Sequence, residues 1–214
     1  MKVALIGATG FVGSQLLNEA LNRGHEVTAI VRRIERLPER PNLTPKQVDI
    51  MDVDALSALL AGHDAVMAAY NPDRTVPGDV FERMVDGAKA IIAATKKSGV
   101  KRLLVVGGAG SLEVAPGQQM IDQPDFPPDW KAGAGGTKQF LYLLKEEPDL
   151  DWTFLSPAAM LQPGERTGKF RLGGDRLLVD EKGECRISTA DYAVAMIDEL
   201  EDPKHTQRRF CVAY

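Results

Sequence analysis

The feature that most constrains the fold is a glycine-rich turn near the start of the chain. It follows residues 3–6, a short apolar run with β-branched residues that is typical of a buried strand. The turn itself, residues 7–13, reads Gly-Ala-Thr-Gly-Phe-Val-Gly. Apolar residues then recur with the spacing of one helical face up to Gly24, which predicts a helix that ends there. A second apolar run, residues 26–31, completes a strand–helix–strand unit.

Such a turn has the properties of a phosphate-binding site. The first amides of a helix have no partner within it, and the helix dipole makes that end positive. Gly7 and Gly10 allow a tight turn, and Gly13 lets the helix pack close to the strand. In this context the glycines predict that the pyrophosphate of a dinucleotide binds here. An ordinary tight turn between a strand and a helix is the alternative.

The residues after the second predicted strand bear on the choice of coenzyme. An acidic residue at this place binds the ribose 2′-hydroxyl of NAD. Arg32 and Arg33 instead offer planar, charged donors to a 2′-phosphate. We therefore expect NADP(H) to be preferred over NAD(H). The alternative is a solvated basic turn, to which Arg36 and Arg40 would also belong.

Strand and helix patterns alternate along the rest of the chain, which predicts an α/β, doubly wound Rossmann fold with a parallel sheet. We expect strands at residues 43–49, 65–69, 102–106, 151–155 and 209–213. Helices are expected at residues 53–60 and 79–98, from 130–137 to 146, and from about 191 to 200. Residues 112–130 are predicted to be a long loop. Its residues Met120, Phe126 and Trp130 either line a pocket or pack the loop onto its own domain.

The expected organisation is a single NAD(P)-binding domain, residues 1–214, with a small substrate lobe at residues 157–185. That segment is rich in glycine and charge, with strand-like pieces at residues 169–171 and 177–179. A net charge of −4 gives no general attraction to nucleic acid or an anionic membrane. No apolar run approaches the roughly 20 residues that span a bilayer. Cys185, Cys211 and the three histidines have no metal-site spacing. We expect a cytoplasmic monomer or homodimer without a metal site.

Three motifs carry a resemblance to a known family: residues 7–13, residues 106–112 (Val-Gly-Gly-Ala-Gly-Ser-Leu) and residues 150–157 (Leu-Asp-Trp-Thr-Phe-Leu-Ser-Pro). They resemble the atypical short-chain dehydrogenases, in particular the NAD(P)H-binding group that includes the NADH-flavin reductases, within the NmrA-like and NAD-dependent epimerase/dehydratase superfamily. The resemblance implies a sheet of order 3-2-1-4-5-6 with a seventh strand. The coenzyme-binding residues that we expect are Gly7, Thr9, Gly10, Phe11, Val12, Gly13, Arg32, Arg33, Asp49, Ile50, Ala68, Ala69, Tyr70, Gly108 and Pro157. Asp49 either contacts the adenine amine or is a plain turn residue.

Catalytic members of the superfamily use Tyr-x-x-x-Lys with an upstream Ser or Thr. Lys138 lies near the place of that lysine and Ser111 near that of the serine, so both are candidate catalytic residues. Ala134 stands where the tyrosine would be, so the general acid for carbonyl–alcohol chemistry is missing. An exposed helical lysine is the alternative for Lys138. Tyr70 replaces the tyrosine only if its loop folds over the nicotinamide.

Three functions fit these features to different degrees. A flavin or quinone accepts electrons in its own ring and takes its proton from water, so an NADPH-dependent reductase of such an acceptor tolerates the missing tyrosine. A non-catalytic, NmrA-like NADP(H) sensor also tolerates it. A sugar epimerase or dehydratase is disfavoured by the missing tyrosine and by the short C-terminal part.

Overall fold

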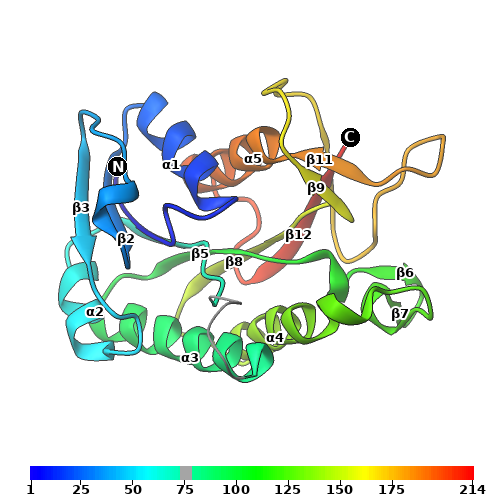
Figure 1. Cartoon of the computed structure of the whole chain (residues 1–214), viewed down its shortest axis with the longest axis horizontal. Helices are drawn as coiled ribbons and strands as arrows, with labels where there is room; N and C mark the ends of the chain where they lie inside the picture. The colour runs from blue at the N-terminus through cyan, green and yellow to red at the C-terminus, as the bar shows by residue number, and fades with distance from the viewer. Residues whose placement is uncertain (73–78) are drawn as a thin grey trace.

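The computed structural model describes residues 1–72 and 79–214, which form a central sheet between two layers of helices (Figure 1). The sheet has eight strands in the order β10-β12-β8-β5-β4-β1-β2-β3. All neighbours are parallel except β10 and β12. The strands are β1 (Lys2–Ile6), β2 (Glu26–Val31), β3 (Leu43–Gln47), β4 (Ala65–Ala68), β5 (Arg102–Val106), β8 (Asp151–Ser156), β10 (Arg171–Gly173) and β12 (Arg208–Ala213). The Rossmann order is confirmed, and β12 is the seventh parallel strand.

The helices form two layers, one on each face of the sheet (Figure 1). One layer contains α1 (Gly13–Asn22) and α5 (Thr189–Glu201), and the other contains α2 (Val53–Leu60), α3 (Val80–Ser98) and α4 (Pro128–Lys145). Two buried apolar clusters fill the spaces between the sheet and these layers. In β1, for example, Leu5 belongs to one cluster and Ile6 to the other. This burial on both faces explains why the central strands are continuous apolar runs.

Local signals fix most helix ends. The Asp52 side chain accepts a hydrogen bond from the Ala55 amide, and α2 has the predicted bounds. Gly99, at φ 81°, ends α3. α4 begins earlier than expected, at Pro128, because its glycines belong to the helix. A Cβ on Gly136 would lie 2.6 Å from the Met84 Cβ, so glycine permits close packing of α4 against α3.

The predicted loop at residues 112–130 contains more structure than expected. It holds a hairpin of β6 (Glu113–Ala115) and β7 (Gln118–Gln119), a 3₁₀ turn η3 (Met120–Asp122), and the start of α4. Two further 3₁₀ turns are η1 (Ile34–Arg36) and η2 (Ala109–Ser111). Phe126 is buried, whereas Trp130 is 55% exposed.

The segment after β8 also differs from the expected strands. β9 (Met160–Gln162) pairs with β11 (Arg186–Ser188) in a separate two-stranded sheet. The piece expected at residues 169–171 lies slightly later, as β10, because residues 171–173 pair with β12. Residues 177–179 are not a strand. The Leu177 amide donates to the Glu113 carbonyl, and the adjacent residue Arg176 makes only an isolated bridge.

Across residues 1–72 and 79–214, no helix is long and apolar enough to cross a membrane. The same residues contain no group of three or more His, Cys, Asp or Glu side chains arranged to hold a metal ion.

Candidate functional site

The glycine turn between β1 and α1 combines tight packing with an open helix end. Gly7 has φ 81°, and a Cβ there would lie 2.4 Å from the Ala69 carbonyl oxygen. A Cβ on Gly13 would lie 2.0 Å from the Gly7 carbonyl oxygen. Gly10 is exposed, and a Cβ there would lie 3.3 Å from its nearest neighbour, the Gly7 carbonyl oxygen. Gly7 and Gly13 are therefore needed for backbone packing, whereas Gly10 leaves the start of α1 open to a ligand. No side chain caps this helix end within the described part of the chain.

A cavity of about 490 Å³ opens beside this turn, at the carboxyl ends of β1, β2 and β4. Its volume is in the range of small-molecule sites. The structure brings together in its lining the expected residues Gly7, Thr9, Gly10, Arg32, Arg33, Asp49, Ile50, Ala69 and Tyr70. Together these residues form a continuous surface from the turn to the ends of β2 and β4.

The other expected coenzyme residues lie outside this cavity. Phe11 is 57% exposed at the turn, and Val12 and Gly13 begin α1. Ala68 is buried in β4. Gly108 and Pro157 follow β5 and β8, farther along the same edge of the sheet. The sequence analysis did not assign Ile6, Ile30, Val31, Arg36, Val48 and Asn71, which also line the cavity. Their positions in the sequence could have indicated them, since each lies at or near the end of a predicted strand or, for Arg36, in the basic turn.

The cavity lining is basic. Arg32, Arg33 and Arg36 face one carboxylate, Asp49. Gln47 Nε2 donates to the Arg32 carbonyl at 3.0 Å, which ties the basic turn to β3. Asp49 Oδ1 accepts from the Met51 amide at 3.0 Å, so Asp49 does serve as a turn residue. The excess of positive charge suits a phosphate group.

Tyr70 lines the cavity with its hydroxyl already engaged. The hydroxyl donates to the Arg83 carbonyl at 3.1 Å. The ring lies directly over Gly87, where a Cβ would be 2.2 Å from Cε1. Burial raises the pKa of Tyr70, and the charges of Arg83 and Arg32 oppose the rise without cancelling it. This arrangement makes Tyr70 a poor proton donor to a ligand.

The two candidate catalytic residues lie outside the cavity. Ser111 is 3% exposed, and its Oγ and carbonyl oxygen each accept a hydrogen bond from Arg209 Nη1 at 3.2 Å. Arg209, on β12, also binds Asp175. Ser111 therefore anchors the segment after β5 to the sheet. Lys138 Nζ lies 5.8 Å from the centroid of the Tyr142 ring, one turn along α4.

Ala134, which stands where an acid–base tyrosine would be expected, faces the segment after β5. A Cβ added to Gly110, in this segment, would lie 3.1 Å from the Ala134 Cβ. α4 and this segment therefore pack closely where a larger side chain would need space. The cavity lining offers arginines and apolar walls, and the side chain of Ala134, outside the cavity, cannot act as an acid.

Comparison with known proteins agrees with this geometry. A family model described as NAD(P)H-binding matches residues 7–203. The chain belongs to this NAD(P)H-binding family. The matched region runs from the glycine turn to just past α5, includes the segments beyond β8, and places the chain among NAD(P)H-binding oxidoreductases.

Three relatives illustrate the similarity. The uncharacterized protein YwnB of Bacillus subtilis is 40% identical over 99% of this chain and 98% of its own length. The crystal structure of a "putative epimerase" from Bacteroides thetaiotaomicron is 47% identical, with a TM-score of 0.93 over 100% of this chain and 96% of that one. The structure of a "putative NADH-flavin reductase" from Streptococcus pneumoniae is 34% identical, with a TM-score of 0.87 over 100% and 99%.

Proposed function

We propose that this protein binds NADPH in the cavity beside the glycine turn and transfers hydride to a small conjugated acceptor, such as a flavin or a quinone. One observation carries the proposal: a basic cavity lies beside the glycine turn, at the carboxyl edge of the sheet. Ala134, outside this cavity, stands where the family resemblance would place an acid–base tyrosine. The similarity to the protein named a "putative NADH-flavin reductase" supports it.

The residues around the cavity fit the coenzyme. The open start of α1 at Gly10 is the place for the pyrophosphate, because side chains are absent there and the helix end is positive. Arg32 and Arg33, joined by Arg36, would hold a 2′-phosphate. Gly108 and Pro157, farther along the sheet edge, would lie beside the nicotinamide.

Bound NADPH supplies a hydride, and the protein then has only to hold two rings in contact. The Tyr70 hydroxyl is used by Arg83, and Ser111 is held by Arg209. Neither hydroxyl is therefore free to act as the acid of the proposed reaction. A conjugated acceptor takes the electron pair into its own ring, so the proton can come from water.

An NADP(H) sensor is the second candidate, because the engaged hydroxyls and Ala134 would equally suit a protein that binds the coenzyme without turnover. The two functions differ in what happens to bound NADPH. A sensor would keep it unchanged in the presence of every acceptor.

The test is NADPH oxidation under anaerobic conditions with a panel of acceptors: FMN, riboflavin, a quinone, a simple ketone and a sugar nucleotide. We expect turnover with flavins or quinones and none with the ketone or the sugar nucleotide. Tight NADPH binding without any turnover would replace this proposal with the sensor. Efficient turnover of the sugar nucleotide would contradict the assignment of Ala134.

A further inference from the structure

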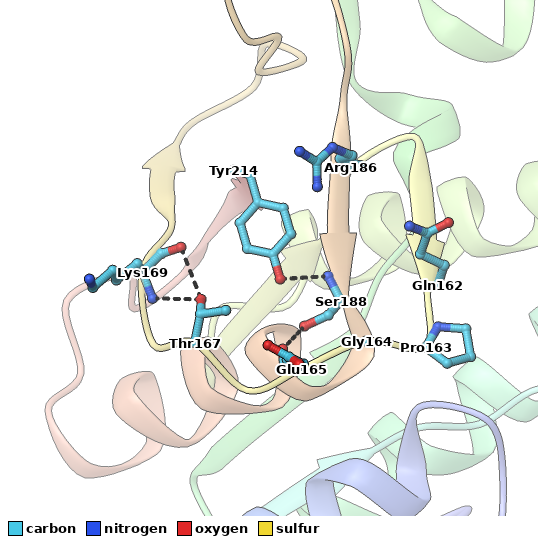
Figure 2. Close-up of a pocket in the computed structure, with 9 residues that line it drawn as sticks. All are labelled: Gln162, Pro163, Gly164, Glu165, Thr167, Lys169, Arg186, Ser188 and Tyr214. Carbon is cyan, nitrogen blue, oxygen red and sulfur yellow. Dashed lines mark hydrogen bonds between the residues drawn. The ribbon is translucent and has the colours of Figure 1, made fainter.

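A second hollow, of about 470 Å³, lies in the segment beyond β8 (Figure 2). It shares no lining residue with the coenzyme cavity. Its walls come from three parts of the chain: the residues after β9, strand β11, and Tyr214, which follows β12. Its volume is comparable to that of the coenzyme cavity and suits a small molecule or part of one.

A buried carboxylate holds these walls together. Asp191, on α5, is fully buried and accepts hydrogen bonds from the Thr167 amide at 2.8 Å and the Gly168 amide at 2.7 Å. It also accepts from the Thr167 hydroxyl at 2.6 Å and the Tyr214 hydroxyl at 2.7 Å. Burial alone would raise the pKa of Asp191, but these hydrogen bonds outweigh it and the pKa is lowered. These contacts tie the walls of the hollow together, and a preformed site loses less free energy to ordering when a ligand binds.

The hydroxyl groups in the hollow are already used. The Tyr214 hydroxyl donates to Asp191 and accepts from the Ser188 amide at 3.3 Å. The Ser188 hydroxyl donates to the Glu165 carbonyl at 2.8 Å (Figure 2). It also accepts from the Asp191 amide at 2.9 Å. Neither residue is therefore available as a nucleophile or an acid, and the hollow is suited to binding.

Cationic side chains outnumber carboxylates in the lining of the hollow. Arg186 and Lys169 are cations, and Glu165 is the one carboxylate in the lining. Arg186 uses Nε to pair with Glu184 at 3.0 Å, and its two terminal nitrogens have no partner in residues 1–72 and 79–214. The guanidinium carbon lies 5.3 Å from the centroid of the Tyr214 ring. In Figure 2 the Lys169 amine points away from this ring, so Arg186 is the cation best placed to bind an anion.

The position of the hollow relates it to the coenzyme. Tyr214 follows the carboxyl end of β12, which is parallel to β8. In the sheet, β12 is two strands from β5, or about 10 Å at the usual spacing of strands. Gly108, expected beside the nicotinamide, follows β5. The hollow therefore lies at the same edge of the sheet as the residues after β5, and the proposal requires that a ring beside the nicotinamide extend a side chain from there toward Arg186.

We propose that this hollow binds the anionic tail of the acceptor, with Arg186 as the residue that contacts it. The preferred acceptor would then be a conjugated ring that bears a phosphate or carboxylate, such as FMN, and not a neutral analogue such as riboflavin. This inference rests on the proposed function for the identity of the ring, and it adds the anionic group.

The test compares the binding of FMN and riboflavin to the protein loaded with NADP⁺, followed by quenching of flavin fluorescence. The wild-type protein should bind FMN about tenfold more tightly or better, as expected for a charge-assisted contact. Arg186→Met should remove about tenfold from the FMN affinity and leave riboflavin unchanged, and Arg186→Lys should retain part of the preference. Arg176→Met, an exposed arginine of the same segment outside the hollow, is the matched control and should change neither.

The outcomes separate this inference from the proposed function. Equal binding of FMN and riboflavin by the wild-type protein, or an equal loss of both in Arg186→Met, would overturn the role of the hollow. If FMN binds through Arg186 but no acceptor oxidises NADPH, the anion site stands and the reductase proposal fails. The NADPH affinity and thermal midpoint of Arg186→Met, measured in parallel, exclude a general loss of structure.

Discussion

At the scale of single residues, the coenzyme site depends on missing side chains as much as on charges. Gly7 and Gly13 each lie where a Cβ would meet backbone atoms at 2.4 Å or less, so they are needed for the fold itself. Gly10 has space around it, so its role is different. A substitution at Gly10 can separate ligand binding from folding.

Gly10→Val should abolish NADPH binding while the chain stays folded. The valine Cβ would contact the Gly7 carbonyl oxygen at 3.3 Å, which a small shift relieves, and the rest of the side chain would cover the start of α1. Titration with NADPH and the thermal midpoint measure the two effects. Gly174→Val, at an open position in the segment beyond β8, is the matched control. Wild-type NADPH affinity in Gly10→Val would show that the pyrophosphate binds elsewhere.

The basic turn should determine the preference for NADPH over NADH. A charge-assisted contact to phosphate contributes roughly 1.5–3 kcal/mol, or about tenfold to over a hundredfold in affinity. The double variant Arg32→Ala/Arg33→Ala should lose this factor for NADPH and keep its affinity for NADH. Both coenzymes are titrated at one fixed ionic strength. Equal affinities of the wild-type protein for NADPH and NADH would show that the arginines do not bind the 2′-phosphate.

At the scale of elements, local signals predicted most of the fold, and contacts between distant residues account for what was missed. α2 has its predicted bounds because Asp52 caps it. The start of α4 was misplaced because its glycines weaken the helix pattern, although they allow packing on α3. β10 is an edge strand whose pairing with β12 spans some forty residues, as the register of Arg171 with Ala213 shows.

The same division applies to the candidate site. The glycines and arginines belong to one contiguous unit, so their spacing predicted that they would meet at one cavity. The engagement of Tyr70 by Arg83 and of Ser111 by Arg209 depends on tertiary packing, and no local pattern contains it. Asp191 gave no signal for the same reason, since its partners lie 23 or 24 residues away.

The contact between β4 and α3 predicts a small effect of removing the Tyr70 hydroxyl. Tyr70→Phe loses one hydrogen bond to the Arg83 carbonyl, which should lower the free energy of unfolding by about 0.5–1.5 kcal/mol. The rate of acceptor reduction should change little, because the hydroxyl is not available to the acceptor. Urea unfolding and anaerobic NADPH oxidation provide the two measurements. A loss of rate by orders of magnitude would identify Tyr70 as the missing acid.

The contact between α5 and the loop at residues 167–168 predicts a pH-dependent stability. The pKa of Asp191 is lowered in the folded protein, so its contribution is present above its ordinary value of 3.8 and is lost as the pH falls through the lower folded value. Asp191→Asn should therefore be less stable than the wild type near neutral pH, by about 1–3 kcal/mol. The difference should shrink below pH 3.8. Urea unfolding of both proteins across this range measures it, and a constant difference would argue against the charged carboxylate.

At the scale of the whole molecule, one edge of the sheet organises both binding regions. The coenzyme cavity lies at the carboxyl ends of β1, β2 and β4, and the second hollow lies beyond the carboxyl end of β12. β5 and β8 lie between them. Gly107 and Gly108 follow β5, and Pro157 follows β8. Under the proposed function, the coenzyme would approach from one side and the acceptor from the other. The contribution of the protein to the proposed reaction would then be to hold the two rings in contact.

The most direct test of this account is a single turnover of the NADPH-loaded protein mixed anaerobically with FMN. We expect the absorbance of NADPH and that of the flavin to fall together, with one mole of NADPH oxidised per mole of flavin reduced, because the hydride passes directly from one ring to the other. Gly10→Val under the same conditions should show neither change. If the wild-type protein holds NADPH tightly and both absorbances stay constant, the protein does not reduce flavins and the proposed function is wrong.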